Sequence, residues 1–227
     1  MCPACVASPD PLAAEYFCVQ CKTPFQNRYP LDEQGRCALC RAGLRGFDAA
    51  YCFGSYEGVL RELIHLFKYS GMRPLARPLG DMLARGLPRE LSFDLIVPVP
   101  LHWYRRWRRG FNQSALLGRE IARRWHIPVK SALGRRRATR IQAGLSNTRR
   151  RANVRGAFRL RRGYSVKGLR ILLIDDVMTT GATAAACASA LKAAGARSVT
   201  LLTLARVDRR FARGRPLSLT ARTGDTF

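Results

Sequence analysis

Acidic residues are scarce in this sequence. It has 15 Asp and Glu against 40 Lys and Arg, which gives a formal net charge of +25 at pH 7. An imbalance of this size indicates polyanionic partners or phosphorylated substrates, although a coding bias towards arginine would give the same count. Because arginine is also the side chain that binds phosphate in a bidentate way, the two explanations are compatible.

Long apolar runs and a secretory start are missing as well. Nowhere do eighteen apolar residues follow one another, and the segment Met1 to Cys5 does not combine a basic stretch with an apolar one. We therefore expect a cytoplasmic protein without membrane insertion. In that compartment, paired cysteines are more often metal ligands than disulfides.

The length and apolar content leave room for a substantial core. With 227 residues, of which 47% are hydrophobic, the chain can form one α/β domain of ordinary size and a small additional unit. This composition excludes a globally disordered chain.

Cysteine is concentrated near the N-terminus, and six of the eight cysteines form Cys-x-x-Cys pairs: Cys2/Cys5, Cys18/Cys21 and Cys37/Cys40. Fifteen residues separate the second pair from the third, which is the spacing of a tetrahedral thiolate site. We predict a structural Zn²⁺ at Cys18, Cys21, Cys37 and Cys40 within a zinc-ribbon domain over 1–46, with a redox dithiol as the alternative. The first pair could replace one of these knuckles or belong to a second site.

Apolar runs predict strands over 47–56, 94–99, 127–133, 171–174 and 198–205. Amphipathic or Ala-rich stretches predict helices over 57–69, 74–87, 114–125 and 184–194. The alternation of strands and helices indicates an α/β fold with a parallel sheet over 47–206. A basic tail over 207–227 follows.

The stretch 171–183 carries the strongest functional signal. Its four apolar residues predict a strand buried on both faces, so Asp175 and Asp176 are expected at the C-terminal edge of a parallel sheet, where ligands bind in such folds. The Thr/Gly turn and the start of the next helix can hold a phosphate, whereas carboxylates accept hydrogen bonds from a diol or bind hydrated Mg²⁺. The residues expected to bind are Asp175, Asp176, Thr179, Thr180, Gly181, Ala182 and Thr183.

A 5-phosphate, a ribose diol and a metal-bound diphosphate occur together in phosphoribosyl pyrophosphate (PRPP). The stretch resembles the thirteen-residue PRPP signature of type I phosphoribosyltransferases, with four apolar residues, two acids and then V-x-T-T-G-x-T. It differs from the Walker loop and from the dinucleotide fingerprint, because neither G-K-S/T nor G-x-G-x-x-G is present. The plain alternative is a buried strand followed by a helix capped by Asp176 or Thr179.

Two further segments are rich in arginine. Arg105, Arg106, Arg108 and Arg109 follow the strand 94–99 and could face a diphosphate or DNA, while the aromatic residues between them could stack on bases or pack in the core. The segment 134–156, which includes Arg140 and Gln142, is long, basic and weakly periodic. It is predicted to form a lid over a phosphorylated ligand, with a solvated basic surface as the alternative.

The order of the motifs resembles the ComF family (competence protein F, or GntX-like). The motifs are the Cys-x-x-Cys knuckles, Tyr56-Glu-Gly-x-Leu60 with His65-x-x-Lys68, Val97-Pro-Val-Pro-Leu101, Arg109-Gly-Phe-Asn-Gln-Ser114, Gln142-x-x-Leu145, Asn153-Val-x-Gly-Ala-Phe158 and the PRPP stretch. The resemblance implies a type I phosphoribosyltransferase fold with an N-terminal zinc ribbon, and a link to DNA uptake with competence-machinery proteins as partners. Family members usually carry a further Cys-x-x-Cys pair before the one that resembles Cys2/Cys5, which leaves a second zinc site in doubt.

Two functions follow as hypotheses. The first is a phosphoribosyltransferase-like enzyme that binds PRPP with Mg²⁺, for which the sequence identifies no general base and no acceptor. The second is a non-catalytic competence factor that binds single-stranded DNA and uses the same fold as a nucleotide sensor.

Overall fold

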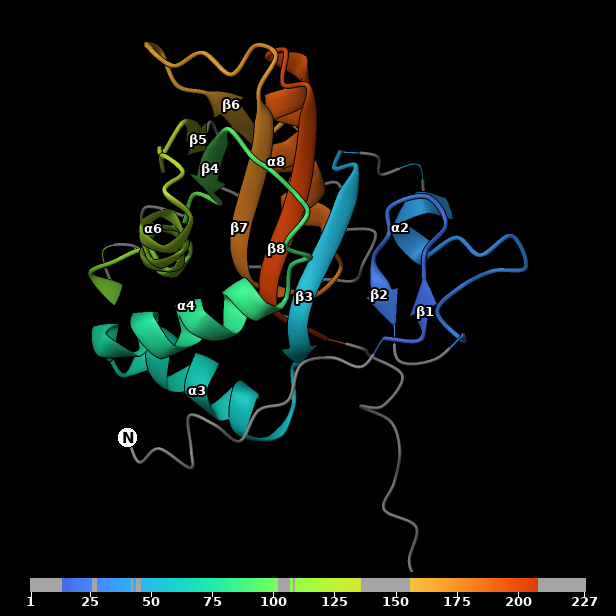
Figure 1. Ribbon diagram of the computed structural model, residues 1–227, viewed down its shortest axis with the longest axis horizontal. Coiled ribbons are helices and arrows are strands. Elements are labelled where there is room, and N and C mark those ends of the chain that lie inside the picture. The colour runs from blue at the N-terminus through green and yellow to red at the C-terminus, as the bar shows by residue number, and fades with distance from the viewer. Residues whose placement is uncertain are drawn as a thin grey trace, which may run out of the picture.

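The structure, a computed structural model, describes residues 14–25, 28–41, 43, 46–101, 107, 109–135 and 156–207 (Figure 1). Its centre is a sheet of four parallel strands in the order β3-β8-β7-β4. These strands span Ala49–Ser55 (β3), Leu95–Pro98 (β4), Arg170–Met178 (β7) and Ser198–Arg206 (β8). The two central strands are apolar along most of their length, as expected for strands that are covered on both faces.

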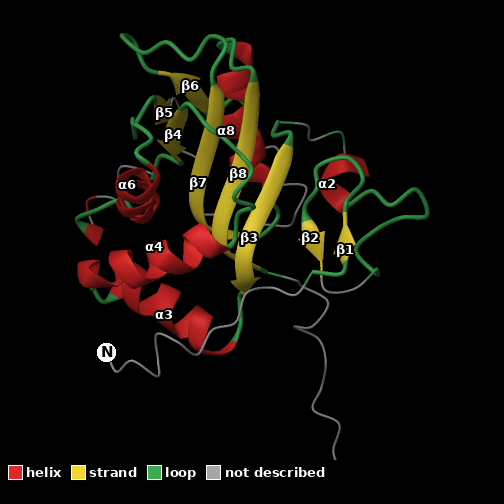
Figure 2. Cartoon of the chain, viewed as in Figure 1, coloured by secondary structure: helices red, strands yellow, loops and turns green. Residues whose placement is uncertain are grey.

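Helices cover the two faces of the sheet unequally (Figure 2). Ile171 and Leu173 of β7 pack in one core with the Ala-rich helix α8 (Ala182–Ala193). Leu172 and Ile174 face the other side and share a core with three helices. These are α3 (Gly58–Tyr69), α4 (Ala76–Arg85), which a 3₁₀ turn η1 (Arg73–Leu75) precedes, and α6 (Gln113–Trp125). The period-two alternation along β7 thus divides its side chains between two cores.

The connections diverge at the carboxyl ends of β4 and β7, a topological switch point that we term the crevice. Ile96 of β4 pairs with Leu172 of β7 on one side and with Val129 on the other. The chain therefore leaves β4 through α6 towards Val129, whereas it leaves β7 through α8 in the opposite direction to β8. Parallel sheets bind ligands at such a switch point, outside the carboxyl ends of the strands. Here these are the ends of β4 and β7.

The predicted strand over 127–133 is wrong. Only Val129 bridges to β4, through hydrogen bonds that join Ile96 to Pro128 and Lys130. The Ala132 N–H then donates to the Lys130 carbonyl, and this tight turn directs the chain away from the main sheet. Residues Leu133–Arg135 instead form β5, which pairs antiparallel with β6 (Phe158–Leu160) in a separate sheet.

The other predicted elements are present with shifted ends. The strand predicted at 171–174 continues to Met178, so both acids lie within β7 rather than after it. Gly195, at φ +91°, follows the C-cap of α8, as predicted for a glycine that ends a helix. No helix among the described residues is both long and apolar enough to cross a bilayer.

A small cysteine-containing unit lies against the edge of the sheet. It contains the hairpin β1 (Tyr16–Phe17) and β2 (Pro24–Phe25) and the short helix α2 (Ala38–Arg41). The Ala50 N–H on β3 donates to the Cys21 carbonyl at 3.0 Å, and the Arg206 guanidinium lies 3.8 Å from the Phe25 ring centroid. Phe25 and the four cysteines thereby join the core on the α8 face.

Candidate functional site

Asp176 forms an ion pair near the carboxyl end of β7. Its Oδ1 lies 2.8 Å from the Nζ of Lys68, which comes from the last turn of α3, and each side chain is 14% exposed. The ion pair therefore joins the sheet to α3 at the crevice. It involves one oxygen of Asp176, and a carboxylate has a second oxygen that can accept hydrogen bonds.

Asp175 lies in a different environment. Its Oδ1 accepts a hydrogen bond from the Ser114 Oγ at 3.1 Å and another from the Asp176 N–H at 2.9 Å. Burial, followed by repulsion from Asp176, raises the pKa of Asp175 to about 7, while Lys68 and the two hydrogen bonds oppose this rise. The pKa of Asp175 therefore lies close to neutral pH.

The loop after β7 leads directly into α8. Gly181 has φ +70°, a left-handed conformation that favours glycine, and no side chain caps the helix at this residue. The Ala182 N–H has a long hydrogen bond to the Thr180 Oγ1 at 3.4 Å, and the first helical bond runs from the Ala185 N–H to the Gly181 carbonyl. Amide groups at the start of a helix of twelve residues can bind an anion, which the helix dipole also favours.

The opposite wall of the crevice is the loop after β4. Asn112 fixes this wall, because its Oδ1 accepts from the Ser114 N–H at 3.1 Å and its Nδ2 donates to the Val99 carbonyl at 3.1 Å. This cap places Ser114 in the first turn of α6, where it reaches Asp175. The β4 loop and the β7 acids are thus joined by side-chain hydrogen bonds.

Arg109 lies at the rim of the same crevice. Its guanidinium is 4.7 Å from the Tyr69 ring centroid, and its Nη1 donates to the Gln113 Oε1 at 3.4 Å. Since Tyr69 follows Lys68 in α3, Arg109 lies beside the helix that supplies the partner of Asp176. The predicted residues Arg105, Arg106 and Arg108 lie outside the described residues.

Two residues with described side chains in the aromatic segment differ in burial, and the stacking hypothesis remains a prediction. Phe111 is buried and contacts Phe67, with 5.6 Å between ring centroids, as expected for core packing. Trp107 is 79% exposed. The remaining aromatic residues of this segment, and the lid residues Arg140 and Gln142, lie outside the described residues.

Four cysteines form a second cluster, far along the chain from the acids. The Sγ atoms of Cys18, Cys21, Cys37 and Cys40 lie within 4.8 Å of one another, and all four residues are buried. The Sγ atoms of Cys18 and Cys40 are 3.7 Å apart, and those of Cys21 and Cys37 are 3.6 Å apart. Burial, together with Cys37 and Cys18, raises the pKa of Cys40 to about 12, while a hydrogen bond with Cys21 opposes the rise. Cys2 and Cys5 lie outside the described residues.

The family and the relatives that this chain matches agree with the observed fold. The phosphoribosyl transferase domain family matches residues 113–219. The chain is 35% identical over 197 residues to the DNA utilization protein YhgH of Escherichia coli O157:H7, and the match covers 84% of each chain. It is 33% identical to competence protein F of Haemophilus influenzae, with coverage of 75% of this chain and 78% of that protein. The chain belongs to the ComF family.

The fold of this ComF protein is that of type I phosphoribosyltransferases, with a parallel sheet flanked by helices and an N-terminal cysteine cluster of the zinc-ribbon kind. Among solved structures, it is similar to a glutamine PRPP amidotransferase from B. subtilis. The identity is 27% and the TM-score 0.39, and the match covers 56% of this chain and 25% of that one.

Two contributors to the ComF site were not predicted from the residues alone. Lys68 and Ser114 are the partners of Asp176 and Asp175, yet each lies far from the acids in the sequence. Both stand in motifs of the family resemblance, which is the one signal that could have identified them. Neither helical periodicity nor residue type distinguishes them from their neighbours.

Proposed function

We propose that this ComF protein binds PRPP, or a related phosphoribosyl ligand, at the crevice between β4 and β7. The observation that carries the proposal is the arrangement of β7, whose two acids lie shortly before a turn that leads into the N-terminus of α8. Asp175 and Asp176 would accept hydrogen bonds from the ribose hydroxyls. Residues 179–183 would hold the 5-phosphate with backbone N–H groups and threonine hydroxyls.

The ion pair of Asp176 is compatible with a bound ribose. Lys68 engages Oδ1, so Oδ2 can accept from a hydroxyl without loss of the pair. We assign Lys68 as a residue that positions Asp176 for the sugar.

Mg²⁺ would come with the diphosphate of the ligand. Carboxylate oxygens are suitable ligands for this hard cation, and Asp175 and Asp176 are the described acids at the crevice that fit it. When bound, the ion would neutralise charge on a departing pyrophosphate. Arg109, with the arginines predicted at 105, 106 and 108, would add positive charge on the same side.

Pentosyl transfer is the reaction this arrangement would support. It breaks the bond between C1 of the ribose and the pyrophosphate oxygen and forms a bond from C1 to an acceptor. The departing pyrophosphate or solvent would take up the proton that the acceptor loses. The basic segment over 134–156 would cover the ligand as a lid.

For the cysteine cluster we propose a structural Zn²⁺. Four sulfurs at about 2.3 Å from a tetrahedral ion would be about 3.8 Å from one another. The two measured separations, 3.7 and 3.6 Å, agree with this value. The Cys37 N–H also donates to the Cys18 Sγ at 3.3 Å, an interaction that would support a zinc-bound thiolate.

Single-stranded DNA binding is a second candidate function. The exposed indole of Trp107 lies in an arginine-rich segment, which is the combination that stacks on bases while it contacts phosphates. Two relatives are named a DNA utilization protein and a competence protein, and these names are compatible with DNA binding. A steep loss of affinity with added salt, reduced in a Trp107→Ala, Arg109→Ser variant, would support it.

Calorimetric titration of PRPP, with and without Mg²⁺, tests the primary proposal. The wild type should bind one ligand per chain, and Asp176→Asn should weaken binding by about tenfold or more, the cost of a hydrogen bond to a charged group. Glu90→Gln, which changes an exposed acid outside the crevice, is the matched control and should bind as the wild type. Equal affinity in all three proteins would refute the site.

A further inference from the structure

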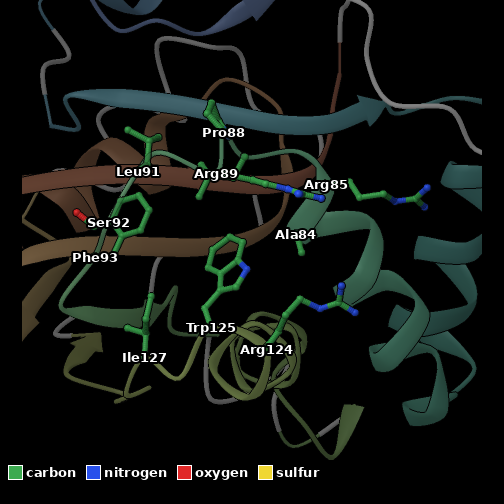
Figure 3. Close-up of a pocket in the computed structure, with 11 residues that line it drawn as sticks. Ala84, Arg85, Pro88, Arg89, Leu91, Ser92, Phe93, Arg124, Trp125 and Ile127 are labelled. Carbon is green, nitrogen blue, oxygen red and sulfur yellow. The ribbon is translucent and has the colours of Figure 1, made fainter.

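A separate cavity of about 750 Å³ lies at the opposite end of β4 from the acid pair (Figure 3). It lies where α4 and α6 end and where the chain enters β4. Its lining residues are Ala84, Arg85, Leu87, Pro88, Arg89, Leu91, Ser92, Phe93, Arg124, Trp125 and Ile127. The volume lies in the range of small-molecule sites.

The walls of this cavity are aromatic and aliphatic. In Figure 3, the Trp125 indole stands in the middle of the group, with the Phe93 ring and Ile127 on one side of it and the Arg124 side chain on the other. Phe93, Trp125 and Ile127 are partly buried and pack against the core under α4 and α6. The rings are therefore held in place by the fold, as a preformed apolar site requires.

Three arginines line the cavity, and only one of them forms an ion pair with a described acid. Arg124 pairs with Asp81, and the Arg85 guanidinium lies 5.2 Å from the Phe53 ring centroid. Arg89 is exposed and has no ion pair or hydrogen bond with any residue that the structure describes. Among the described residues, no acidic side chain lines the cavity. Arg85 also has no acidic partner among the described residues, but its guanidinium lies over the Phe53 ring, so Arg89 is the lining arginine with neither an acid nor a ring contact there.

A neighbouring hollow between α4 and α6 does not share these properties. Its lining consists only of charged residues, Arg77, Asp81, Glu120, Arg123 and Arg124. Asp81 pairs with Arg124, and Glu120 pairs with Arg123. It has no apolar wall, and its acids are already paired with arginines, so it offers little to a small anionic ring.

We infer that the cavity over Trp125 binds a small aromatic anion, namely one or two rings that carry a single anionic group. The rings would lie between Phe93 and Trp125, and the anion would pair with Arg89. One anionic group fits better than several, because the C-terminal ends of α4 and α6 also face this region and carry partial negative charge. The site is independent of the crevice at the other end of the sheet.

Fluorescence titration of the full chain with 8-anilinonaphthalene-1-sulfonate, an aromatic monoanion, tests the inference. Arg89→Ser should weaken binding about tenfold, and Trp125→Leu should weaken it at least as much. Arg119→Ser removes an exposed arginine of α6 that does not line the cavity, and it should leave binding unchanged. N-phenyl-1-naphthylamine, an uncharged analogue, should bind the wild type and Arg89→Ser equally.

Three results would overturn the inference. They are unchanged probe affinity in Arg89→Ser, an equal loss in Arg119→Ser, and displacement of the probe by ribose 5-phosphate. The last result would place the probe in the crevice instead. Because Arg89 is exposed, its variant should fold as the wild type does, and a thermal melt checks this. The outcome does not depend on PRPP binding.

Discussion

The cysteine unit (residues 14–41) and the parallel sheet each gather reactive side chains, but different forces hold the two clusters together. The cysteine unit has two-residue strands, and apart from the four cysteines its buried apolar residues among those described are Pro24 and Phe25. The sheet has a core on each face. Its acids are fixed by Lys68 and Ser114. If the sulfur cluster binds Zn²⁺ as proposed, it would depend on the metal, whereas the acid pair is held by side chains of the protein itself.

Removal of one sulfur is expected to have the largest effect. Cys21→Ser should abolish binding of Zn²⁺ and unfold the cysteine unit, because structural zinc contributes on the order of 10 kcal/mol to such units. Metal content and protease cleavage within 14–41 measure this. Cys52→Ser, at a buried cysteine of β3 outside the cluster, should retain the metal. Full metal content in Cys21→Ser would contradict the dependence.

The matching change in the sheet should leave the fold in place. Asp176→Asn leaves the Lys68 ammonium without its partner at a mostly buried position, which should cost about 1–3 kcal/mol of unfolding free energy. The double variant Asp176→Asn, Lys68→Met should regain much of that stability in a denaturant titration while PRPP binding stays weak. If the double variant were less stable than Asp176→Asn, Lys68 would have a role beyond this pair.

The pH dependence of stability reports the contribution of Asp175 to the free energy of unfolding. Its folded pKa of about 7 lies above the ordinary value of 3.8, so the folded state binds more protons than the unfolded state between these values. Asp175 therefore makes its full contribution to the free energy of unfolding below about pH 4, and this contribution is lost as the pH rises to about 7. The melting temperature of Asp175→Asn should fall less than that of the wild type between pH 5 and pH 7.5, and parallel curves would exclude the shift.

The smallest effect is expected at the turn before α8. Gly181→Ala introduces a Cβ at φ +70°, which should cost about 1 kcal/mol and tilt the first amides of the helix. Phosphate affinity should fall about fivefold, with little change in the acid pair. Gly163→Ala carries a similar φ of +82° in a turn outside the crevice, so it controls for strain alone. Equal phosphate affinity in both variants would remove the turn from the site.

Much of the sheet could be predicted because its strands are continuous apolar runs. The run at 171–174 identified β7, and the acids after it identified the end that carries the crevice. The strand at 127–133 was mispredicted because apolar content does not reveal that the chain turns away at Ala132. The Lys68–Asp176 and Ser114–Asp175 contacts depend on how α3 and α6 pack on the sheet. Local sequence does not encode that packing.

The most direct test of the central claim is a crystal structure of the full chain with PRPP and Mg²⁺. The ribose hydroxyls should lie within about 3.2 Å of the carboxylate oxygens of Asp175 and Asp176. The 5-phosphate should contact the backbone amides of residues 179–183. A phosphate bound elsewhere, with the acids contacting only Lys68 and Ser114, would contradict the claim.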